Sequence, residues 1–333
     1  MKRTSATRPG IILTLILLMG GGIFFMINMP GDSHSGVLPP LSADEILLRD
    51  HLERHVTVLA GAIGERNVWR HDALEAAADY IEETLRELGY AVAKQVYDAK
   101  GIVVRNLETE IVGSQWPDEI VLIGAHYDSL RGTPGANDNA SGVAALLEIA
   151  RLLTKTNPAR TVRFVAFVNE EPPFFYSSEM GSRVYARRAR ERNDNIVAML
   201  SLETIGYYAD AKGSQQYPLP FYSLFYPDTG DYIAFVGNLS SRALVRKSLG
   251  SFRQHTAFPS EGIAAPGWLG GIHWSDHWSF WQEGYRALMV TDTAPFRYPH
   301  YHSGSDTPDK IDYPRMARVV AGLARVTMDL ANK

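Results

Sequence analysis

The chain has 333 residues, of which 45% are hydrophobic and 21% are charged, close to the globular average, which excludes wholesale disorder and fibrous architectures. The net charge of −4 and the lack of a basic stripe argue against a nucleic-acid partner. Cysteine is absent, which excludes disulfides and thiolate metal sites, so any metal is expected to be held by His, Asp and Glu side chains.

The first thirty residues predict a membrane anchor. Residues 11–29 carry no charged side chain, and Lys2, Arg3 and Arg8 precede them. At about 1.5 Å per residue, a helix over this run would match the thickness of the bilayer hydrocarbon. By the positive-inside bias we expect a basic cytoplasmic tail at 1–10, a transmembrane signal anchor at 11–29 and the rest on the extracytoplasmic side. Cleavage as a signal peptide, which would release a secreted protein, is the alternative.

A linker rich in Gly, Ser and Pro is expected at 30–41, followed by one α/β domain at 42–333. A capping-box spacing from Ser42 to Glu45 begins the first helical stretch. Short apolar runs typical of buried strands then alternate with amphipathic stretches, in chain order: helix 73–88, strands 92–96, 102–112 and 119–124, helix 141–153, strand 162–168, helix 178–190, strands 197–205 and 232–236, helix 240–252, strand 287–291 and helix 313–330. This alternation predicts a three-layer α/β/α sandwich around a mostly parallel sheet.

Histidines and carboxylates follow several of these predicted strands. In open α/β sheets, ligands bind at the carboxyl ends of the strands. Five separate segments supply such side chains without any cysteine, which is a pattern suited to Zn²⁺ or another divalent cation. The candidate residues are His126, Asp128, Asp138, Glu170, Glu171, Glu203 and His302.

Glu170 and Glu171 are the most informative of these residues. Two adjacent carboxylates directly after an apolar strand repel each other, and a cation would stabilise them there. A solvated turn is the alternative interpretation. Glu203 is expected near the end of an apolar strand, where a buried carboxylate requires a hydrogen-bond partner or a metal.

The other candidates are weaker when each is taken alone. His126 and Asp128 share one face of an extended strand, so Asp128 could orient the ring of a metal-bound histidine. Taken singly, however, this pair could form an ordinary polar turn, Asp138 could lie in a helix-entry loop, and His302 could be a surface histidine. The metal hypothesis rests on their occurrence together.

The segments HYDS, GANDNASG, NEE, SLETIG, SDHWSF and YHSGSDTPDKI, in this order, resemble the co-catalytic zinc aminopeptidase family. This family contains secreted bacterial leucyl-type aminopeptidases and yeast vacuolar aminopeptidase Y, and glutaminyl cyclases are its relatives. The resemblance covers about residue 59 to the C-terminus. It implies a phosphorylase/hydrolase-like zinc exopeptidase fold, two zinc ions per chain and peptides as substrates.

Carried over residue by residue, the resemblance implies that His126 and Glu203 bind one zinc and that Glu171 and His302 bind the other. It makes Asp138 the bridging carboxylate, and it implies a non-proline cis peptide bond after this residue. Two further roles follow from it. Glu170 would be the general base that acts on a metal-bridging hydroxide, and Asp128 would support His126. The family usually has Asp where this chain has Glu203, which leaves the geometry of that ligand open.

Two aromatic-rich segments, 207–232 and 262–281, could line a substrate pocket next to the metals or could simply pack onto the body of the domain. We expect the pocket to prefer bulky apolar N-terminal residues. The candidate substrate-binding residues are Tyr207, Tyr226, Asp276 and His277.

Three alternatives to an aminopeptidase remain open at this point. The first is a single-zinc acyltransferase of the glutaminyl cyclase type, and the second is a carboxypeptidase or dipeptidase of the same superfamily. The third is a catalytically inactive receptor domain that keeps the fold. The sequence does not determine the oligomeric state.

Overall fold

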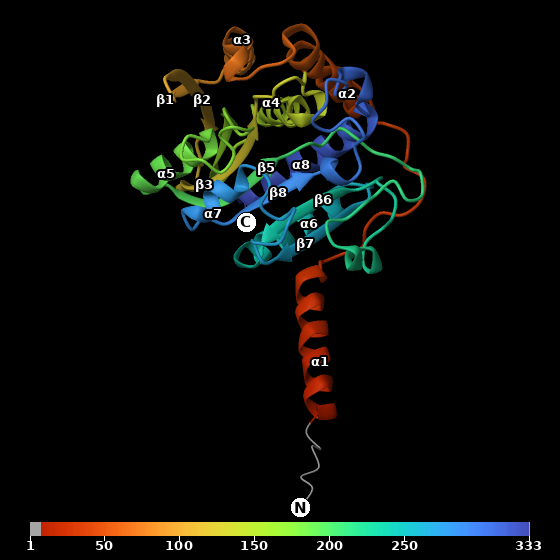
Figure 1. Cartoon of the computed structure of the whole chain (residues 1–333). Coiled ribbons are helices and arrows are strands. Elements are labelled where there is room, and N and C mark those ends of the chain that lie inside the picture. Colours follow the sequence, from red (N-terminus) through yellow and green to blue (C-terminus); the bar gives the residue numbers. More distant parts are fainter. Residues whose placement is uncertain (1–7, 333) are drawn as a thin grey trace, which may run out of the picture.

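The computed structural model describes residues 8–332, and one eight-stranded sheet organises them (Figure 1). The strands are β1 (Ala93–Ala99), β2 (Ile102–Ile111), β3 (Trp116–His126), β4 (Arg160–Phe167), β5 (Asn195–Leu202), β6 (Ile233–Asn238), β7 (Ser260–Ala265) and β8 (Ala287–Thr291). The helices are α1 (Arg8–Ile27), α2 (Ala43–Val56), α3 (His71–Glu87), α4 (Gly142–Leu153), α5 (Gly181–Glu191), α6 (Arg242–His255), α7 (His277–Gln282) and α8 (Tyr313–Asn332).

The strands follow the order β1-β2-β4-β3-β5-β8-β6-β7. The four central strands, β4, β3, β5 and β8, are parallel. Antiparallel pairs occur toward both edges, between β1 and β2, β2 and β4, and β6 and β8. The predicted parallel sheet is therefore confirmed at its centre. Because the central strands run in one direction, the segments that follow them meet at one edge of the sheet.

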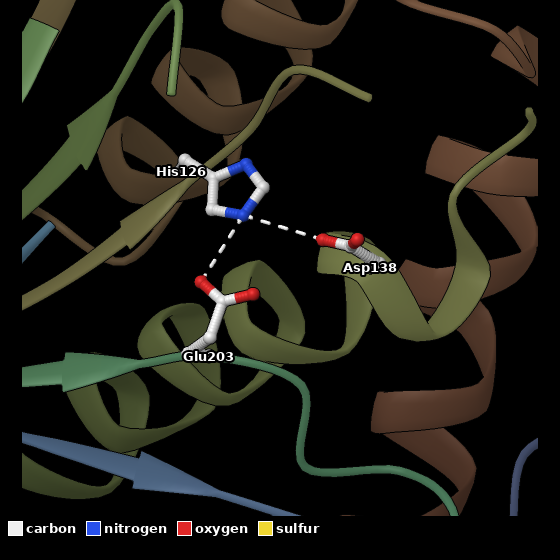
Figure 2. A group of neighbouring side chains, drawn as sticks. All are labelled: His126, Asp138 and Glu203. Atoms are coloured by element: carbon white, nitrogen blue, oxygen red, sulfur yellow. Dashed lines mark ion pairs between the residues drawn. The ribbon is translucent and has the colours of Figure 1, made fainter. Parts of the chain in front are cut away.

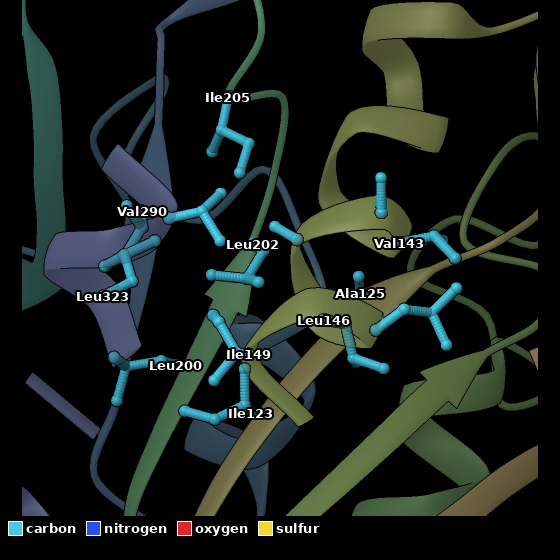
Figure 3. Packing of buried hydrophobic residues seen from close by; sticks show 14 of the residues in the cluster. Ile123, Ala125, Val143, Leu146, Ile149, Leu200, Leu202, Ile205, Val290 and Leu323 are labelled. Atoms are coloured by element: carbon cyan, nitrogen blue, oxygen red, sulfur yellow. The ribbon is translucent and has the colours of Figure 1, made fainter. Parts of the chain in front are cut away.

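Helices cover both faces of the sheet, which confirms the three-layer sandwich. The larger buried cluster joins the sheet to α2, α3, α4, α6 and α8, and a second cluster joins the other face to α5 and α7. Figure 3 shows Val143, Leu146 and Ile149 of α4 packed with Ile123 and Leu200 of the sheet. Burial of apolar surface at about 25 cal/mol per Å² makes this packing the main stabilising contribution to the fold.

Two elements were not predicted, and several boundaries differ by a few residues, one of them at a candidate ligand. The edge strand β7 has the sequence SEGIAA, which lacks a β-branched run, and the helix α7 is too short for a helical periodicity to be recognised. The strand β5 ends at Leu202, so Glu203 follows the strand instead of lying within it. Ser42 forms the predicted capping box with Glu45 at the start of α2.

The predicted N-terminal tail lies mostly outside the described residues, because the structure describes nothing before Arg8. Figure 1 shows α1 projecting from the domain. Its last turn is held by α6, where Arg242 Nε donates to the carbonyl of Phe25 at 2.7 Å. Among the described residues we find no helix with the length and apolar character needed to cross a membrane.

Candidate metal centre

Five predicted metal ligands come together beyond the carboxyl ends of the central strands. His126 is the last residue of β3, Glu171 follows β4, and Glu203 follows β5. Asp138 comes from the loop that leads into α4, and His302 comes from the loop after β8. The donors therefore come from the ends of β3, β4 and β5 and from two loops, and the topology brings these segments together.

The first group of donors is His126, Asp138 and Glu203 (Figure 2). His126 Nε2 lies 3.4 Å from Asp138 Oδ1 and 3.3 Å from Glu203 Oε2. All three residues are buried. Figure 2 shows both carboxylates directed at the same ring nitrogen, so one imidazole nitrogen and two carboxylate oxygens converge on one point.

The second group of donors is Asp138, Glu171 and His302. His302 Nε2 lies 3.1 Å from Asp138 Oδ2 and 3.7 Å from Glu171 Oε2. Asp138 therefore offers one oxygen to each group. The resemblance assigns the two histidines to different ions that share Asp138, and both rings contact this one carboxylate.

Several donor atoms of these two groups have no hydrogen-bond partner within the protein, as expected of atoms that bind a pair of cations. His126 Nε2, Asp138 Oδ1 and Glu171 Oε1 are buried and lack a hydrogen-bond partner, although buried polar atoms are normally satisfied. Burial raises the pKa of Glu171, and the neighbouring Asp138 raises it further. Nitrogen and carboxylate oxygen are the donors that zinc uses in proteins without thiolates.

Asp128 and Glu170 lie directly beside these donors. Asp128 Oδ1 accepts a hydrogen bond from the backbone N–H of Glu170, and its Oδ2 accepts one from that of Glu171, each at 3.1 Å. Its Oδ1 also lies 3.5 Å from His126 Nδ1. The Asp128 carboxylate thus ties the end of β3 to the loop after β4. Glu170 Oε2 lies 3.9 Å from His126 Nε2, at the edge of the first group.

The comparison with known proteins agrees with this geometry. The model of peptidase family M28 matches residues 106–327 of the chain. The chain belongs to peptidase family M28. The Escherichia coli protein YfbL is 41% identical to this M28 peptidase over 282 residues, which cover 82% of this chain and 86% of YfbL. A probable zinc metalloprotease of Phaeosphaeria nodorum is 28% identical over 212 residues, and this match covers 54% of the chain but 42% of the longer fungal protein.

Solved structures show the same fold. BSAP, a zinc aminopeptidase from Bacillus subtilis, superimposes with a TM-score of 0.69 at 15% identity, covering 86% of this chain and 95% of that one. A glutaminyl cyclase of Bacteroides thetaiotaomicron gives a TM-score of 0.64 at 18% identity, with coverage of 88% and 99%. The likeness in fold agrees with the family match, which makes this chain a peptidase of family M28.

The loop of Asp138 is held by residues that the sequence interpretation did not include. Asp306 accepts hydrogen bonds from the backbone N–H groups of Asn137 at 2.8 Å and Asp138 at 3.1 Å. Asp292 accepts one from the side-chain amide of Asn137 at 2.9 Å. The Asp138–Asn139 peptide bond is cis, as the resemblance implied.

Arg66 is a fully buried cation beneath this loop. Its guanidinium donates to the carbonyl oxygens of Tyr127 at 2.7 Å, Pro134 at 2.5 Å and Gly135 at 2.8 Å, among others. Burial lowers its pKa to about 10, and the acidic groups around it oppose this change. At neutral pH it therefore remains charged and fixes the segment between His126 and Asp138. No sequence motif indicated this role.

Ser275 supports Glu203, the ligand whose geometry the sequence left open. Its hydroxyl donates to Glu203 Oε2 at 2.7 Å and lies 2.9 Å from the hydroxyl of Ser201. Oε2 is also the oxygen that faces His126. The longer glutamate side chain is thereby held with one defined oxygen toward the first group of donors.

A pocket begins beside Glu203. Of the four predicted substrate-binding residues, only Tyr226 lines it. Tyr207 packs against a neighbouring tyrosine ring. Asp276 is fully buried, and burial raises its pKa to about 7. His277 donates through Nε2 to the carbonyl of Ile272 at 2.8 Å, and burial lowers its pKa to about 4. The other three do not line this pocket, and their part in substrate binding stays a prediction.

Proposed function

We propose that this M28 peptidase is an aminopeptidase that holds two zinc ions and removes N-terminal residues from peptides. The observation that carries this proposal is the pair of donor groups that share Asp138, with His126 in one group and His302 in the other. Asp138 would bridge the two ions. The buried ligand atoms that lack a hydrogen-bond partner support this assignment.

Zinc, when bound, lowers the pKa of a coordinated water to about 7 and polarises the scissile carbonyl. The residues of the chain supply the remaining chemistry. We assign Glu170 as the general base, which takes a proton from the attacking water and delivers it to the leaving nitrogen. Burial raises the pKa of Glu170 and the charge of Glu203 raises it further, although His126 opposes the change. A base with a raised pKa suits catalysis near neutral pH.

Tyr301 is a further candidate for a catalytic residue. It lies in the pocket wall with Glu203, and burial together with the charge of Asp138 raises the pKa of its phenol well above the usual value. The hydroxyl is therefore protonated at neutral pH and can donate a hydrogen bond to the oxygen that develops negative charge. Donors of this kind contribute about 10²–10³-fold to rate in other hydrolases.

A glutaminyl cyclase-like activity is the second candidate, because that enzyme class shares the fold. The two proposals differ in metal content and in product. A cyclase would hold one zinc and form pyroglutamate from N-terminal glutamine. The donors of both groups are present in this chain, which favours the aminopeptidase.

The deciding experiment combines metal analysis with an assay on aminoacyl arylamides. We expect two zinc ions per chain, hydrolysis of the arylamides and no formation of pyroglutamate. The variant E170Q should retain both zinc ions and lose about 10²–10⁴-fold in kcat. E179Q is the matched control, because Glu179 is a carboxylate of the same loop that takes no part in either donor group, and it should retain full activity. Full turnover by E170Q with intact zinc content would remove Glu170 from this role.

A further inference from the structure

The pocket beside the metal centre contains a carboxylate that peptide hydrolysis does not use. The pocket begins at Glu203 and Tyr301 and extends over β8 and β6 to Glu261 on the edge strand β7. Its other lining residues are mostly apolar or aromatic.

The register of the sheet places Glu261 in line with the metal ligand Glu203. Thr291 of β8 lies opposite Ala234 of β6, and Ala234 lies opposite Glu261 of β7. The backbone N–H of Glu203 donates to the carbonyl of Val290, which extends the same row on the other side of β8. Neighbouring strands are about 4.8 Å apart, so the row spans about 14 Å.

The residues that line the pocket along this row suit a long substrate side chain. Thr291 and Ala234 are the residues of the row between the two glutamates, and both are short. Aromatic side chains form the walls, namely Tyr217, Tyr222, Tyr226, Tyr232, Trp274 and Phe296. Aromatic faces attract cations as well as apolar groups. A substrate side chain with an apolar stem and a cationic end would match both the walls and Glu261.

The carboxylate of Glu261 is available to such a cation. Arg253 is the basic residue beside it, at 3.9 Å, but its N–H groups donate to the backbone carbonyls of residues 30, 31 and 260. The hydroxyl of Tyr226 donates to the carbonyl of Gly262, and that of Tyr217 donates to the carbonyl of Pro227. Glu261 has a hydrogen bond with Ser33 and a distant ion pair with Arg253, and these leave further acceptor capacity on its two oxygens.

We propose that Glu261 recognises the cationic end of an N-terminal lysine or arginine and makes basic residues preferred substrates. The inference rests on the proposed aminopeptidase function. The aliphatic stem of the substrate side chain packs between the tyrosines, and the charged end reaches Glu261. Large apolar N-terminal residues pack between the same aromatic side chains but make no ionic contact with Glu261.

The test compares kcat/KM for lysyl, arginyl, leucyl and phenylalanyl arylamides in the full-length zinc enzyme and in E261Q. We expect kcat/KM for the two basic substrates to fall by about tenfold or more, as for loss of a hydrogen bond to a charged group, and kcat/KM for the leucyl substrate to change by less than about threefold. E261D, which keeps the charge, should retain part of the basic preference. D231N is the matched control, because Asp231 acts on Glu261 electrostatically but does not line the pocket.

The outcomes separate the two proposals. A wild-type enzyme that cleaves none of the four arylamides overturns the aminopeptidase function and this inference with it. Cleavage with an unchanged lysyl-to-leucyl ratio in E261Q overturns the role of Glu261 alone. If the lysyl-to-leucyl ratio of kcat/KM fell equally in D231N, the role of Glu261 would also be overturned, because the effect would then be a general electrostatic one. Unfolding temperatures of all variants show whether each is folded.

Discussion

At the scale of single residues, the metal centre concentrates negative charge in the protein interior. Glu170 and Glu203 are buried within 3.9 Å of His126, and the buried Glu171 belongs to the donor group that contains Asp138. The fixed cation that the chain itself provides nearby is Arg66, which is engaged with backbone carbonyls. Such a group of acids is costly to bury unless cations bind, so the stability of the metal-free protein is expected to depend on pH.

Whether stability rises or falls with pH follows from the direction in which folding changes the pKa values of these acids. Burial raises the pKa of Glu170, Glu171 and Glu203 in the folded metal-free protein. The folded state then binds more protons than the unfolded state, where a glutamate has a pKa of about 4.3, so the free energy of unfolding falls as pH rises above this value. The pKa of Asp138 is lowered despite its burial, by His126 and His302, and this opposite effect operates only at more acidic pH.

We therefore expect urea unfolding of the EDTA-treated protein to give a free energy that decreases by more than about 1 kcal/mol between pH 5 and pH 8. The zinc-loaded protein should show a smaller decrease, because bound cations compensate the carboxylates. The prediction would be contradicted if the free energy of unfolding of the EDTA-treated protein stayed constant or rose between pH 5 and pH 8.

At the scale of elements, the start of α4 is packed directly against the end of β5. The side chain of Asn139 joins them, since its amide donates to the carbonyl of Leu202 and its oxygen accepts from the N–H groups of Gly142 and Thr204. A Cβ at Gly142 would lie 2.4 Å from Asn139 Oδ1 and 2.5 Å from the carbonyl oxygen of Leu202. This glycine allows the helix to approach closely enough to place Asp138 between the two histidines.

The substitution G142A should therefore separate α4 from β5. We expect a loss of about 1–3 kcal/mol in the free energy of unfolding, and weaker binding of zinc measured by competition with a chelator. G21A is the control, because Gly21 also lies in a helix but a Cβ added there would have no neighbouring atom within 4 Å, and it should leave zinc affinity unchanged. Unchanged zinc affinity in G142A would show that the close approach does not set the metal geometry.

At the scale of the whole molecule, the metal centre joins segments that are far apart along the chain. The donors extend from His126 to His302, and they belong to the ends of parallel strands, the loops that follow them and the loop before α4. Cations that bind the folded state only, and bind across such distant segments, stabilise the entire domain through mass action.

Removal of zinc should accordingly lower the unfolding temperature of the domain as one cooperative transition. Binding at a free zinc concentration a thousand times Kd contributes about 4 kcal/mol per site. We expect calorimetry to show a loss of several degrees in EDTA that zinc restores. H302A, which removes a donor of the second group only, should show about half of this stabilisation. A transition insensitive to both EDTA and H302A would mean that zinc does not bind at these residues.

The sequence by itself determined the kind and order of the donors. Period-two and period-3.6 patterns identified most strands and helices, and the segments around His126, Glu171 and His302 indicated the metal chemistry, because both signals depend on residues that are near one another in the chain. Only the tertiary structure decided that both histidines contact Asp138, that Arg66 lies beneath the loop, and that Glu261 shares a row with Glu203. These relations depend on strand order and register across distant parts of the chain, which local patterns do not encode.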